Sequence, residues 1–462
     1  MLDQIARWNA WLNGYVWGWP TIVLLLGTGF VLTIMTRGAQ FRYLGLTLRE
    51  VLGKITQKAH APGSVSPFQA VSTALASTVG VGNIAGVATA IFIGGPGALF
   101  WLWVSGVLGM ATKYAEIVTA LHYREPDETG VMRGGAMYTL SRGLRLPWLG
   151  TIFALLTSLA AFVIGNMVQA NSVAASLTES FGLDARISAV LMIVLTAVVI
   201  LGGIKRIGEF TSVLVPFMAI VYLAGGMVII LLHIGDLPRV LANVFDGAFN
   251  GAAATGGFVG ATMMMAMRFG IARGLFSNEA GLGSAPMVHA AAQTDHPVRQ
   301  GMYGIFEVFV DTILICTTSG LVILLTDTWT TGAEGAALSA RAFETGLPGV
   351  WGDLIVTVGI VLFAYSTIVG WSYYGETGIV YLLGARAAMP YRILWLVAIY
   401  FGATGSLSVV WGVADTLNGL MAVPNLVAVL GSIPLLLRLQ KQFFEAEMMK
   451  KMMERERAAQ RR

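Results

Sequence analysis

Long apolar stretches, separated by short polar segments, dominate the chain. Eleven of them reach the length of about 20 residues that a helix needs to cross a bilayer. They lie at residues 16–36, 67–93, 97–122, 148–177, 186–203, 210–233, 254–275, 300–325, 352–382, 391–411 and 416–438. Before the first of them, Ile5, Trp8, Leu12 and Tyr15 recur at helical spacing, which predicts an amphipathic helix at the membrane interface. The pattern predicts an all-α polytopic membrane protein with eleven transmembrane helices.

Glycine and polar residues interrupt the second span near its middle. Gly80, Gly82 and Gly86 cluster there beside Thr78 and Asn83, and each glycine inside a helix costs about 1 kcal/mol relative to alanine. One interpretation is close packing of helices through small residues. The other, which the neighbouring polar side chains favour, is an unwound segment whose backbone groups line a cavity and bind a ligand.

The seventh span repeats this feature five helices later, with glycines at positions 256, 257, 260, 270 and 274. Spans two to six and seven to eleven thus form two groups of five, and each group opens with an interrupted helix. Since five is odd, the second group enters the membrane from the opposite side, which makes the two groups an inverted repeat. Interrupted helices at corresponding positions of two halves indicate a transport site near the middle of the membrane.

Lysine and arginine residues are distributed unevenly between the two sides that this topology defines. Five lie in the segment 37–66 and eight lie from Arg438 to the end of the chain, whereas the opposite side receives four in total. Basic loops stay in the cytoplasm. We therefore expect a multi-pass protein of the cell (inner) membrane, with its N-terminus outside and its C-terminus in the cytoplasm. The chain divides into an N-terminal part with the extra span and a cytoplasmic loop, two five-helix repeats and a basic tail, at 1–66, 67–233, 254–438 and 439–462.

The composition fits a membrane protein and disfavours several other classes. Hydrophobic residues make up 56% of the 462 residues and charged residues only 12%, about half the charged share of soluble domains. The single cysteine, Cys316, excludes an internal disulfide and a cysteine-based zinc site. The five histidines lack metal-binding spacing, and the spans contain neither a nucleophile–base pair nor a P-loop. An intramembrane enzyme and an ATP-driven pump are therefore disfavoured, as is a channel, which would need a repeated filter.

Three motifs make the chain recognisable. Residues 273–286 (RGLFSNEAGLGSAP), 78–87 (TVGVGNIAGV) and 133–138 (RGGAMY) resemble the signatures of the alanine/glycine:cation symporter family, and the resemblance runs from about residue 15 to 440. Two positions depart from the family pattern: Ala136 stands where the family usually has proline, and Thr139 where a second tyrosine is common. The resemblance implies a LeuT-type fold, a five-plus-five inverted repeat preceded by one extra N-terminal helix. It also implies sodium- or proton-coupled uptake of small neutral amino acids across the lipid bilayer, with alanine and glycine as substrates and no nucleic-acid partner.

A zwitterionic amino acid needs hydrogen-bond donors for its carboxylate and acceptors for its ammonium group. Backbone N–H groups at the start of a half-helix suit a carboxylate. Given the resemblance, we expect the carboxylate to be held on the first interrupted helix. The expected donors are the backbone N–H groups of Gly80, Val81, Gly82 and Asn83 and the hydroxyl of Thr78.

The other side of the substrate is expected to meet three elements. Free carbonyls at Phe269, Gly270 and Ile271 would hold the ammonium group and close over the side chain; ordinary core packing is the alternative for Phe269 and Ile271. Resemblance to the family assigns substrate contact to Gln169, for which an interhelical hydrogen bond is the alternative. Trp371 would limit the site to very small side chains, unless it is an interfacial anchor.

The coupling ion is expected to bind between the first interrupted helix and the ninth span. Ser366 and Thr367 form a hydroxyl pair after Phe363, and this arrangement resembles the sodium site shared by LeuT-type symporters. The resemblance implies that the carbonyls of Ala76 and Val79 complete a Na⁺ site with Phe363, Ser366 and Thr367. Alternatively, both hydroxyls bond carbonyls of their own helix, as serine and threonine often do in membrane helices.

Four charged residues within the spans remain to be placed, Lys113 and Glu116 in the third span and Glu307 and Asp311, one turn apart, in the eighth. Lys113 and Glu116 lie near the expected cytoplasmic end of the third span, so we expect them to snorkel to the interface. Asp311 lies deeper, where it could relay a proton, pair with Arg268 or Arg273, or bond a neighbouring threonine. A Na⁺-coupled symporter is the leading hypothesis, with a proton-coupled permease of the same fold as the alternative.

Overall fold

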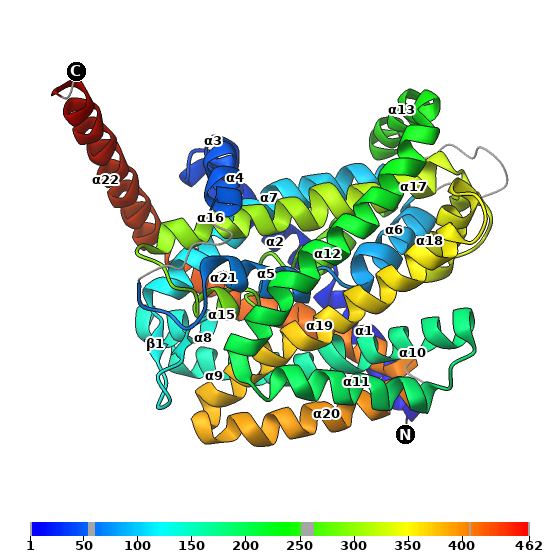
Figure 1. Cartoon of the computed structure of the whole chain (residues 1–462), viewed down its shortest axis with the longest axis horizontal. Helices are drawn as coiled ribbons and strands as arrows, with labels where there is room; N and C mark the ends of the chain where they lie inside the picture. The colour runs from blue at the N-terminus through cyan, green and yellow to red at the C-terminus, as the bar shows by residue number, and fades with distance from the viewer. Residues whose placement is uncertain (1, 54–60, 251–262, 406–407, 461–462) are drawn as a thin grey trace.

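The computed structural model describes residues 2–53, 61–250, 263–405 and 408–460, and these are almost entirely helical (Figure 1). The N-terminal part contains α1 (Leu2–Val16), α2 (Trp19–Met35), α3 (Ala39–Arg42) and α4 (Leu44–Gly53). The amphipathic helix predicted at the N-terminus is confirmed as a helix by α1, on which Trp8, Trp11 and Tyr15 are exposed.

The next part of the chain, up to residue 250, forms a bent helix pair followed by longer helices. It comprises α5 (Pro67–Thr78), the π-helical turn η1 (Gly82–Gly86), α6 (Val87–Gly94), α7 (Gly97–His122), β1 (Glu125–Pro126), β2 (Met132–Arg133), α8 (Ala136–Tyr138), η2 (Thr139–Gly143), α9 (Pro147–Ala160), η3 (Ala161–Met167), α10 (Val168–Phe181), α11 (Ala185–Ile200), α12 (Gly203–Leu232), η4 (Ile234–Asp236) and α13 (Leu237–Phe249). Strands β1 and β2 form a small antiparallel hairpin.

The remainder begins at residue 263, because part of the predicted seventh span, 254–262, lies outside the described residues. It comprises α14 (Met263–Asn278), α15 (Pro286–His289), α16 (Pro297–Val308), η5 (Phe309–Cys316), α17 (Thr317–Leu325), η6 (Thr328–Thr330), α18 (Gly335–Gly346), α19 (Trp351–Leu383), η7 (Ala385–Ala387), α20 (Ala388–Thr404), α21 (Ser408–Gly431) and α22 (Ile433–Gln460).

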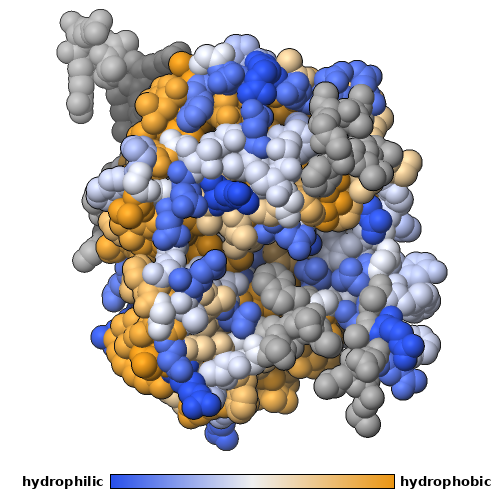
Figure 2. Space-filling model, turned by 90° about the vertical axis from the view of Figure 1, so that its right-hand side faces the viewer, coloured by the Kyte–Doolittle hydropathy of each residue, from blue (hydrophilic) through white to orange (hydrophobic). Residues whose placement is uncertain are grey.

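Several helices are long and apolar enough to cross a membrane. Within the described residues, seven stretches meet this test by length and composition: Arg7–Met35, Pro147–Phe181, Gly203–Leu232, Pro297–Leu325, Trp351–Leu383, Ala385–Thr404 and Gly412–Gly431. The bent pair Pro67–Thr78 and Gly82–Gly94 makes an eighth. Figure 2 shows polar residues across much of one face of the molecule and apolar residues gathered along its left and lower edges. The count of eleven spans and the inverted repeat stay predictions.

The interruption predicted in the second span is confirmed. Helix α5 starts with a capping box, in which Ser66 and Gln69 bond each other's backbone N–H groups, and it ends at Thr78. After a short non-helical linker the chain resumes as η1 and α6, bent by 53° from α5. We call residues 79–81 the first break.

Part of the interruption predicted in the seventh span, at Gly256, Gly257 and Gly260, lies outside the described residues, and the described part of the span shows no break before residue 279. Helix α14 continues without a break to Asn278, and a loop with left-handed backbone angles at Glu279 (φ 55°), Gly281 (φ 94°) and Gly283 (φ 78°) follows before α15. We call residues 279–285 the second break. The helical glycines that suggested an earlier break serve close packing instead, since a Cβ on Gly270 would collide with the carbonyl of Ala98 on α7.

The C-terminal helix also begins earlier than the predicted tail. Helix α21 ends at Gly431, and α22 starts at Ile433 and extends away from the body (Figure 1). Its first half is docked rather than solvated: Phe444 stacks on Tyr43 at 4.0 Å between ring centroids, and Glu447 pairs with Arg299 at 2.6 Å. The boundary between the second repeat and the tail, predicted at 438/439, therefore falls within one continuous helix.

Candidate functional site

A cavity of about 350 Å³ adjoins the first break. It lies where η1 and α6 meet α10, α14 and the N-terminus of α18. Its lining is Val81, Gly82, Ala85, Gly86, Thr89, Gln169, Ser172, Arg273, Phe276, Gly335 and Ala336. We call it the main cavity. Of the predicted substrate residues, Val81, Gly82 and Gln169 line it, and it is large enough for a small organic molecule.

The backbone of the first break lies next to a hydroxyl and an amide group. A Cβ on Gly80 would stand 2.8 Å from Thr367 Oγ1 and 3.6 Å from Gln169 Oε1, so only glycine allows this approach. Gln169 donates its amide N–H to the Ile164 carbonyl at 3.1 Å, a bond within its own helix and not the interhelical bond that was the alternative. Its Oε1 is buried and accepts no hydrogen bond from the described residues. Gln169 therefore offers a free acceptor beside the break.

The first break releases the carbonyl of Ala76 from its helix. In a regular α-helix this carbonyl would accept the N–H of Gly80, but that N–H donates to Asn83 Oδ1 at 2.9 Å. Ser366 and Thr367 each donate a hydroxyl to Ala76 O at 3.1 Å. Both also donate to the carbonyl of Phe363, at 2.8 and 2.9 Å.

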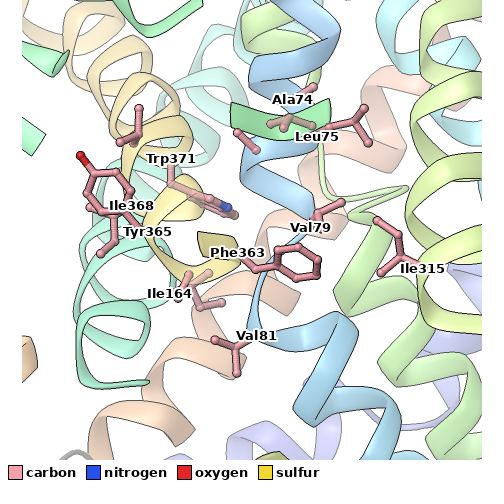
Figure 3. Packing of buried hydrophobic residues seen from close by; sticks show 14 of the residues in the cluster. Ala74, Leu75, Val79, Val81, Ile164, Ile315, Phe363, Tyr365, Ile368 and Trp371 are labelled. Carbon is pink, nitrogen blue, oxygen red and sulfur yellow. The ribbon is translucent and has the colours of Figure 1, made fainter. Parts of the chain in front are cut away.

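Of the residues predicted for the Na⁺ site, four are thus in direct contact through the carbonyls of Ala76 and Phe363 and the hydroxyls of Ser366 and Thr367. Ser366 and Thr367 bond a carbonyl of their own helix, as the structural alternative proposed, and also one across the break. Val79 lies in the same buried cluster as Phe363. Figure 3 shows Phe363 and Trp371 of α19 and Ile164 of η3 gathered around the break between Val79 and Val81. Carbonyl and hydroxyl oxygens are ligands suited to a hard cation.

Asp311 forms a second polar cluster on the other side of the first break. Its carboxylate accepts hydrogen bonds from Asn83 Nδ2 at 2.6 Å, Ser277 Oγ at 3.0 Å and Thr312 Oγ1 at 2.8 Å. Of the pairings we considered, the bond to a neighbouring threonine is confirmed. No arginine pairs with Asp311 among the described residues. Asn83 therefore links Gly80 to a buried carboxylate, and the sequence signal was an aspartate within an apolar span.

The prediction for Phe269, Gly270 and Ile271 is not matched by their positions. Gly270 packs on α7, and Ile271 belongs to an apolar cluster with residues of α2 and α21. Phe269 lines a separate cavity of about 100 Å³ near Trp17 and Asp415. At the main cavity α14 presents Arg273 and Phe276 instead, because the helix continues to Asn278 and only its last turns reach the first break.

Trp371 and Thr78 are buried rather than cavity-lining. The indole N–H of Trp371 donates to Glu279 Oε1 at 3.0 Å, and only 1% of the residue is exposed. This burial contradicts the interfacial-anchor alternative. The Thr78 hydroxyl donates to the Ala74 carbonyl at 3.2 Å, within its own helix.

Lys113 and Glu116 do not snorkel, contrary to our expectation. Lys113 is fully buried and its Nζ lies 3.2 Å from Glu307 Oε1, while His289 Nε2 lies 3.0 Å from Glu307 Oε2. Glu116 Oε1 accepts the N–H of Gly281 at 2.9 Å and an N–H of the Asn425 amide. The physical reason is pairing: a buried charge with a close partner does not need to reach water.

The RGGAMY motif lies at the β1–β2 hairpin. Arg133 pairs with Glu376 of α19 at 2.8 Å and with Asp127 at 3.0 Å, and Arg392 of α20 also pairs with Glu376, at 2.7 Å. Burial tends to raise the pKa of the Asp127 carboxyl, but hydrogen bonds from Thr129 and Arg133 outweigh it and hold that pKa below its ordinary value. The hairpin is thereby fixed to α19.

Helix α18 was missed by the sequence analysis. Gly335 and Ala336 at its start line the main cavity, and the Ser339 hydroxyl donates to the Ile84 carbonyl at 3.0 Å. The segment is short and rich in small and polar residues, so a search for membrane-length apolar stretches passes over it. Regular spacing of Leu338, Ala342 and Phe343, all buried, was the available signal.

Comparison with known proteins decides the class. The sequence profile of the sodium:alanine symporter family matches residues 2–458. The chain belongs to this family. The sodium/alanine symporter AgcS of Methanococcus maripaludis is 48% identical over 93% of this chain and 95% of its own length. The probable sodium/glutamine symporter GlnT of Bacillus subtilis is 37% identical over 90% of this chain and 86% of its own length.

Membership of the sodium:alanine symporter family makes the chain a transporter and an integral membrane protein, not an enzyme. A third relative, the putative sodium/proton-dependent alanine carrier protein YrbD of Bacillus subtilis, is 36% identical over 92% of this chain and 90% of its own length. Among solved structures, a manganese transporter of Eremococcus coleocola superposes with a TM-score of 0.51 at 13% identity, over 81% of this chain and 85% of that one. At this identity the likeness concerns the fold alone.

Proposed function

We propose that this family member couples inward movement of Na⁺ to uptake of small neutral amino acids, alanine and glycine first among them, by alternating access across the cell membrane. The observation that carries the proposal is the Ala76 carbonyl, which the first break frees and the hydroxyls of Ser366 and Thr367 meet. A cation at this point would be held by groups from both α5 and α19. Its binding would therefore fix the break relative to the rest of the molecule.

The substrate is proposed to bind at the first break, above this ion site. The groups proposed to meet the substrate are the backbone of Gly80, Val81 and Gly82 and the free oxygen of Gln169. Thr78 and Asn83 stabilise the break through hydrogen bonds to the backbone at Ala74 and Gly80. Polar backbone groups in a membrane protein occur where they line a cavity or bind a ligand. Phe276 takes the covering role that we had expected of Phe269. Trp371, one helical turn beyond Thr367, would limit the size of the substrate side chain.

The names of the relatives support this substrate class without narrowing it. AgcS and YrbD are named for alanine, and GlnT is named for glutamine. These side chains differ in size, so the identity of the residues beneath the break should decide which substrate is preferred. We assign this chain to the small end of the range, because the bulky Trp371 packs against Gly165, on the helix that carries Gln169 of the main cavity.

Uptake into proteoliposomes tests the proposal directly. Purified protein is reconstituted, and accumulation of labelled alanine is measured with an inward Na⁺ gradient at equal pH, and with an inward proton gradient at equal Na⁺. We expect concentrative uptake with the Na⁺ gradient alone, and competition by unlabelled glycine. Uptake that follows the proton gradient and ignores Na⁺ would refute Na⁺ coupling.

Proton coupling is the second candidate, and one observation favours it. Asp311 is a buried carboxylate that bonds Asn83 of the first break and Ser277 of α14, so a proton bound there would also act on both elements. Asp311→Asn keeps the size of the side chain and removes the titrating group. If coupling runs through Na⁺ at Ser366 and Thr367, this variant should retain Na⁺-driven uptake; loss of all uptake by folded protein would favour the proton route.

A further inference from the structure

We propose that Glu279 is a positioning residue: it holds the indole of Trp371 in place and thereby sets the upper limit on the size of the transported side chain. This inference rests on the proposed function, because it concerns which neutral amino acids are accepted. The inference goes beyond the proposed function, because Glu279 lies in the second break and does not line the main cavity.

The Glu279 carboxylate holds two groups from different parts of the chain. Its Oε1 accepts the indole N–H of Trp371 at 3.0 Å, and its Oε2 accepts a hydrogen bond from the hydroxyl of Ser284. Glu279 is 4% exposed, Trp371 1% and Ser284 0%. Water is thus kept from this carboxylate, and an indole N–H that lost its acceptor here would be left unsatisfied in the protein interior, which is unfavourable.

The backbone of Glu279 is itself rigidly held. Its φ of 55° lies in the left-handed region, which costs energy for a residue with a side chain. Its N–H closes the last turn of α14 on Leu275 O at 3.0 Å, and its carbonyl accepts the N–H of Leu282 at 3.2 Å. Glu116 of α7 and Asn425 of α21 clamp Gly281 two residues later. The carboxylate is therefore presented from a fixed point.

Trp371 in turn presses against the helix that carries Gln169. A Cβ on Gly165 would overlap the Trp371 side chain, so the ring rests directly on the π-helical turn η3. The neighbouring Ile164 carbonyl holds the Gln169 amide, and Gln169 lines the main cavity. A chain of contacts thus runs from Glu279 through Trp371 and η3 to Gln169, and it connects the second break to the lining of the main cavity.

A purely electrostatic role for Glu279 is the alternative to positioning. Lys113, Glu116 and Glu307 lie in the same buried region, so Glu279 could act through its charge. The two roles predict different results for glutamine, which has no charge but can accept the Trp371 N–H with its carbonyl and donate its amide to Ser284. Glu116→Gln is the matched control, because it removes a charge from this region and leaves the bond to Trp371 intact.

Two measurements are made on each purified, reconstituted variant. The first is the ratio of the half-inhibitory concentrations of leucine and alanine against labelled alanine uptake. The second is the ¹⁹F spectrum of protein labelled with 5-fluorotryptophan, in which the Trp371 signal is identified by its loss in Trp371→Phe. We expect Glu279→Ala to lower the leucine-to-alanine ratio about tenfold and to shift or broaden the Trp371 signal. Glu279→Gln and Glu116→Gln should keep the leucine-to-alanine ratio within about twofold of wild type and leave the Trp371 signal unchanged.

Each other outcome overturns the inference. An unchanged Trp371 signal in Glu279→Ala would show that Glu279 does not hold the indole. A shifted Trp371 signal with an unchanged leucine-to-alanine ratio would show that the position of the indole does not determine which side-chain sizes are accepted. A fall of the leucine-to-alanine ratio in Glu279→Gln and Glu116→Gln as large as in Glu279→Ala would assign Glu279 an electrostatic role. Failure of the proposed function is distinguishable, because wild-type protein would then show no Na⁺-driven alanine uptake, whereas the ¹⁹F comparison still reports on the contact.

Discussion

Removal of one hydroxyl from the proposed ion site is the sharpest test of Na⁺ coupling. Ser366 and Thr367 both donate to the Ala76 carbonyl at 3.1 Å, and both are buried. With a cation present, the two hydroxyls would turn their lone pairs toward it, as serine and threonine hydroxyls can. Ser366→Ala and Thr367→Ala each delete one such oxygen. Thr367→Ser is the control, because it keeps the hydroxyl and removes only a methyl group.

The size of the effect follows from the geometry. A hydrogen bond or ligand to a charged group contributes about 1.5–3 kcal/mol, and about 1.4 kcal/mol corresponds to a tenfold change in affinity. The Na⁺ concentration for half-maximal alanine uptake should therefore rise about ten- to a hundredfold in each alanine variant. Folding should survive either single change, since the remaining hydroxyl still satisfies the Ala76 and Phe363 carbonyls.

The assay is initial-rate uptake of labelled alanine in proteoliposomes over a series of Na⁺ concentrations, at two values of pH. High Na⁺ should restore much of the rate in Ser366→Ala and Thr367→Ala, a change of pH should restore little, and Thr367→Ser should stay near wild type. Wild-type Na⁺ dependence in both alanine variants, together with loss of uptake in Asp311→Asn, would refute the ion site and favour proton coupling.

Three further predictions concern size selection, buried charge and topology. Trp371→Ala should weaken alanine uptake and admit larger neutral amino acids in a competition assay, and an unchanged profile in folded protein would leave the ring a packing role only. Lys113→Met should destabilise the protein by about 3–5 kcal/mol, because it leaves Glu307 buried without its cation; Lys113→Met combined with Glu307→Gln should recover much of this in a thermal-unfolding assay in detergent, and additive losses would contradict the pairing argument. A cysteine at Glu128 should be labelled by an impermeant reagent only after cells are permeabilised, whereas one at Glu334 should react in intact cells; the reverse pattern would invert the expected orientation.

The first break could be predicted from the sequence because its cause is local. Three glycines with Thr78 and Asn83 in an apolar span weaken the helix and provide bonds for the freed backbone groups, as Asn83 does for Gly80. The hydroxyl pair at Ser366 and Thr367 was likewise visible, since it stands out in an apolar helix. The hydrogen bonds from these hydroxyls to the Ala76 carbonyl join α19 to α5. The family resemblance implied this contact, whereas the spacing of residues along the chain did not predict it.

The second break was not predicted, and the glycines at 270 and 274 pointed elsewhere because glycines have two uses in membrane helices. Gly270 and Gly274 let α14 approach α7, and nothing in the sequence separates that use from unwinding. The break at 279–285 depends on left-handed residues and on bonds from Glu116 and Asn425, which lie far away in the sequence. The same limit applies to Lys113: its partner Glu307 is on another helix, so its own position near a helix end suggested snorkelling instead.

The proposed Na⁺ site and the proposed substrate site both use the backbone of residues 76–82, and this shared segment can couple the two binding events. The Gly80 N–H donates to Asn83 Oδ1 and not to the Ala76 carbonyl, so the carbonyl proposed to bind the ion and the glycine proposed to bind the substrate would belong to one hydrogen-bonded turn in a continuous helix. A tenfold Na⁺ gradient supplies about 1.4 kcal/mol and a potential of 100 mV about 2.3 kcal/mol for one charge. Their sum of about 3.7 kcal/mol corresponds to about 500-fold accumulation for one Na⁺ per substrate. That ratio is reached only if neither ligand crosses alone, and a break that both ligands must order is a physical means of enforcing it, because either one by itself leaves part of the ordering undone.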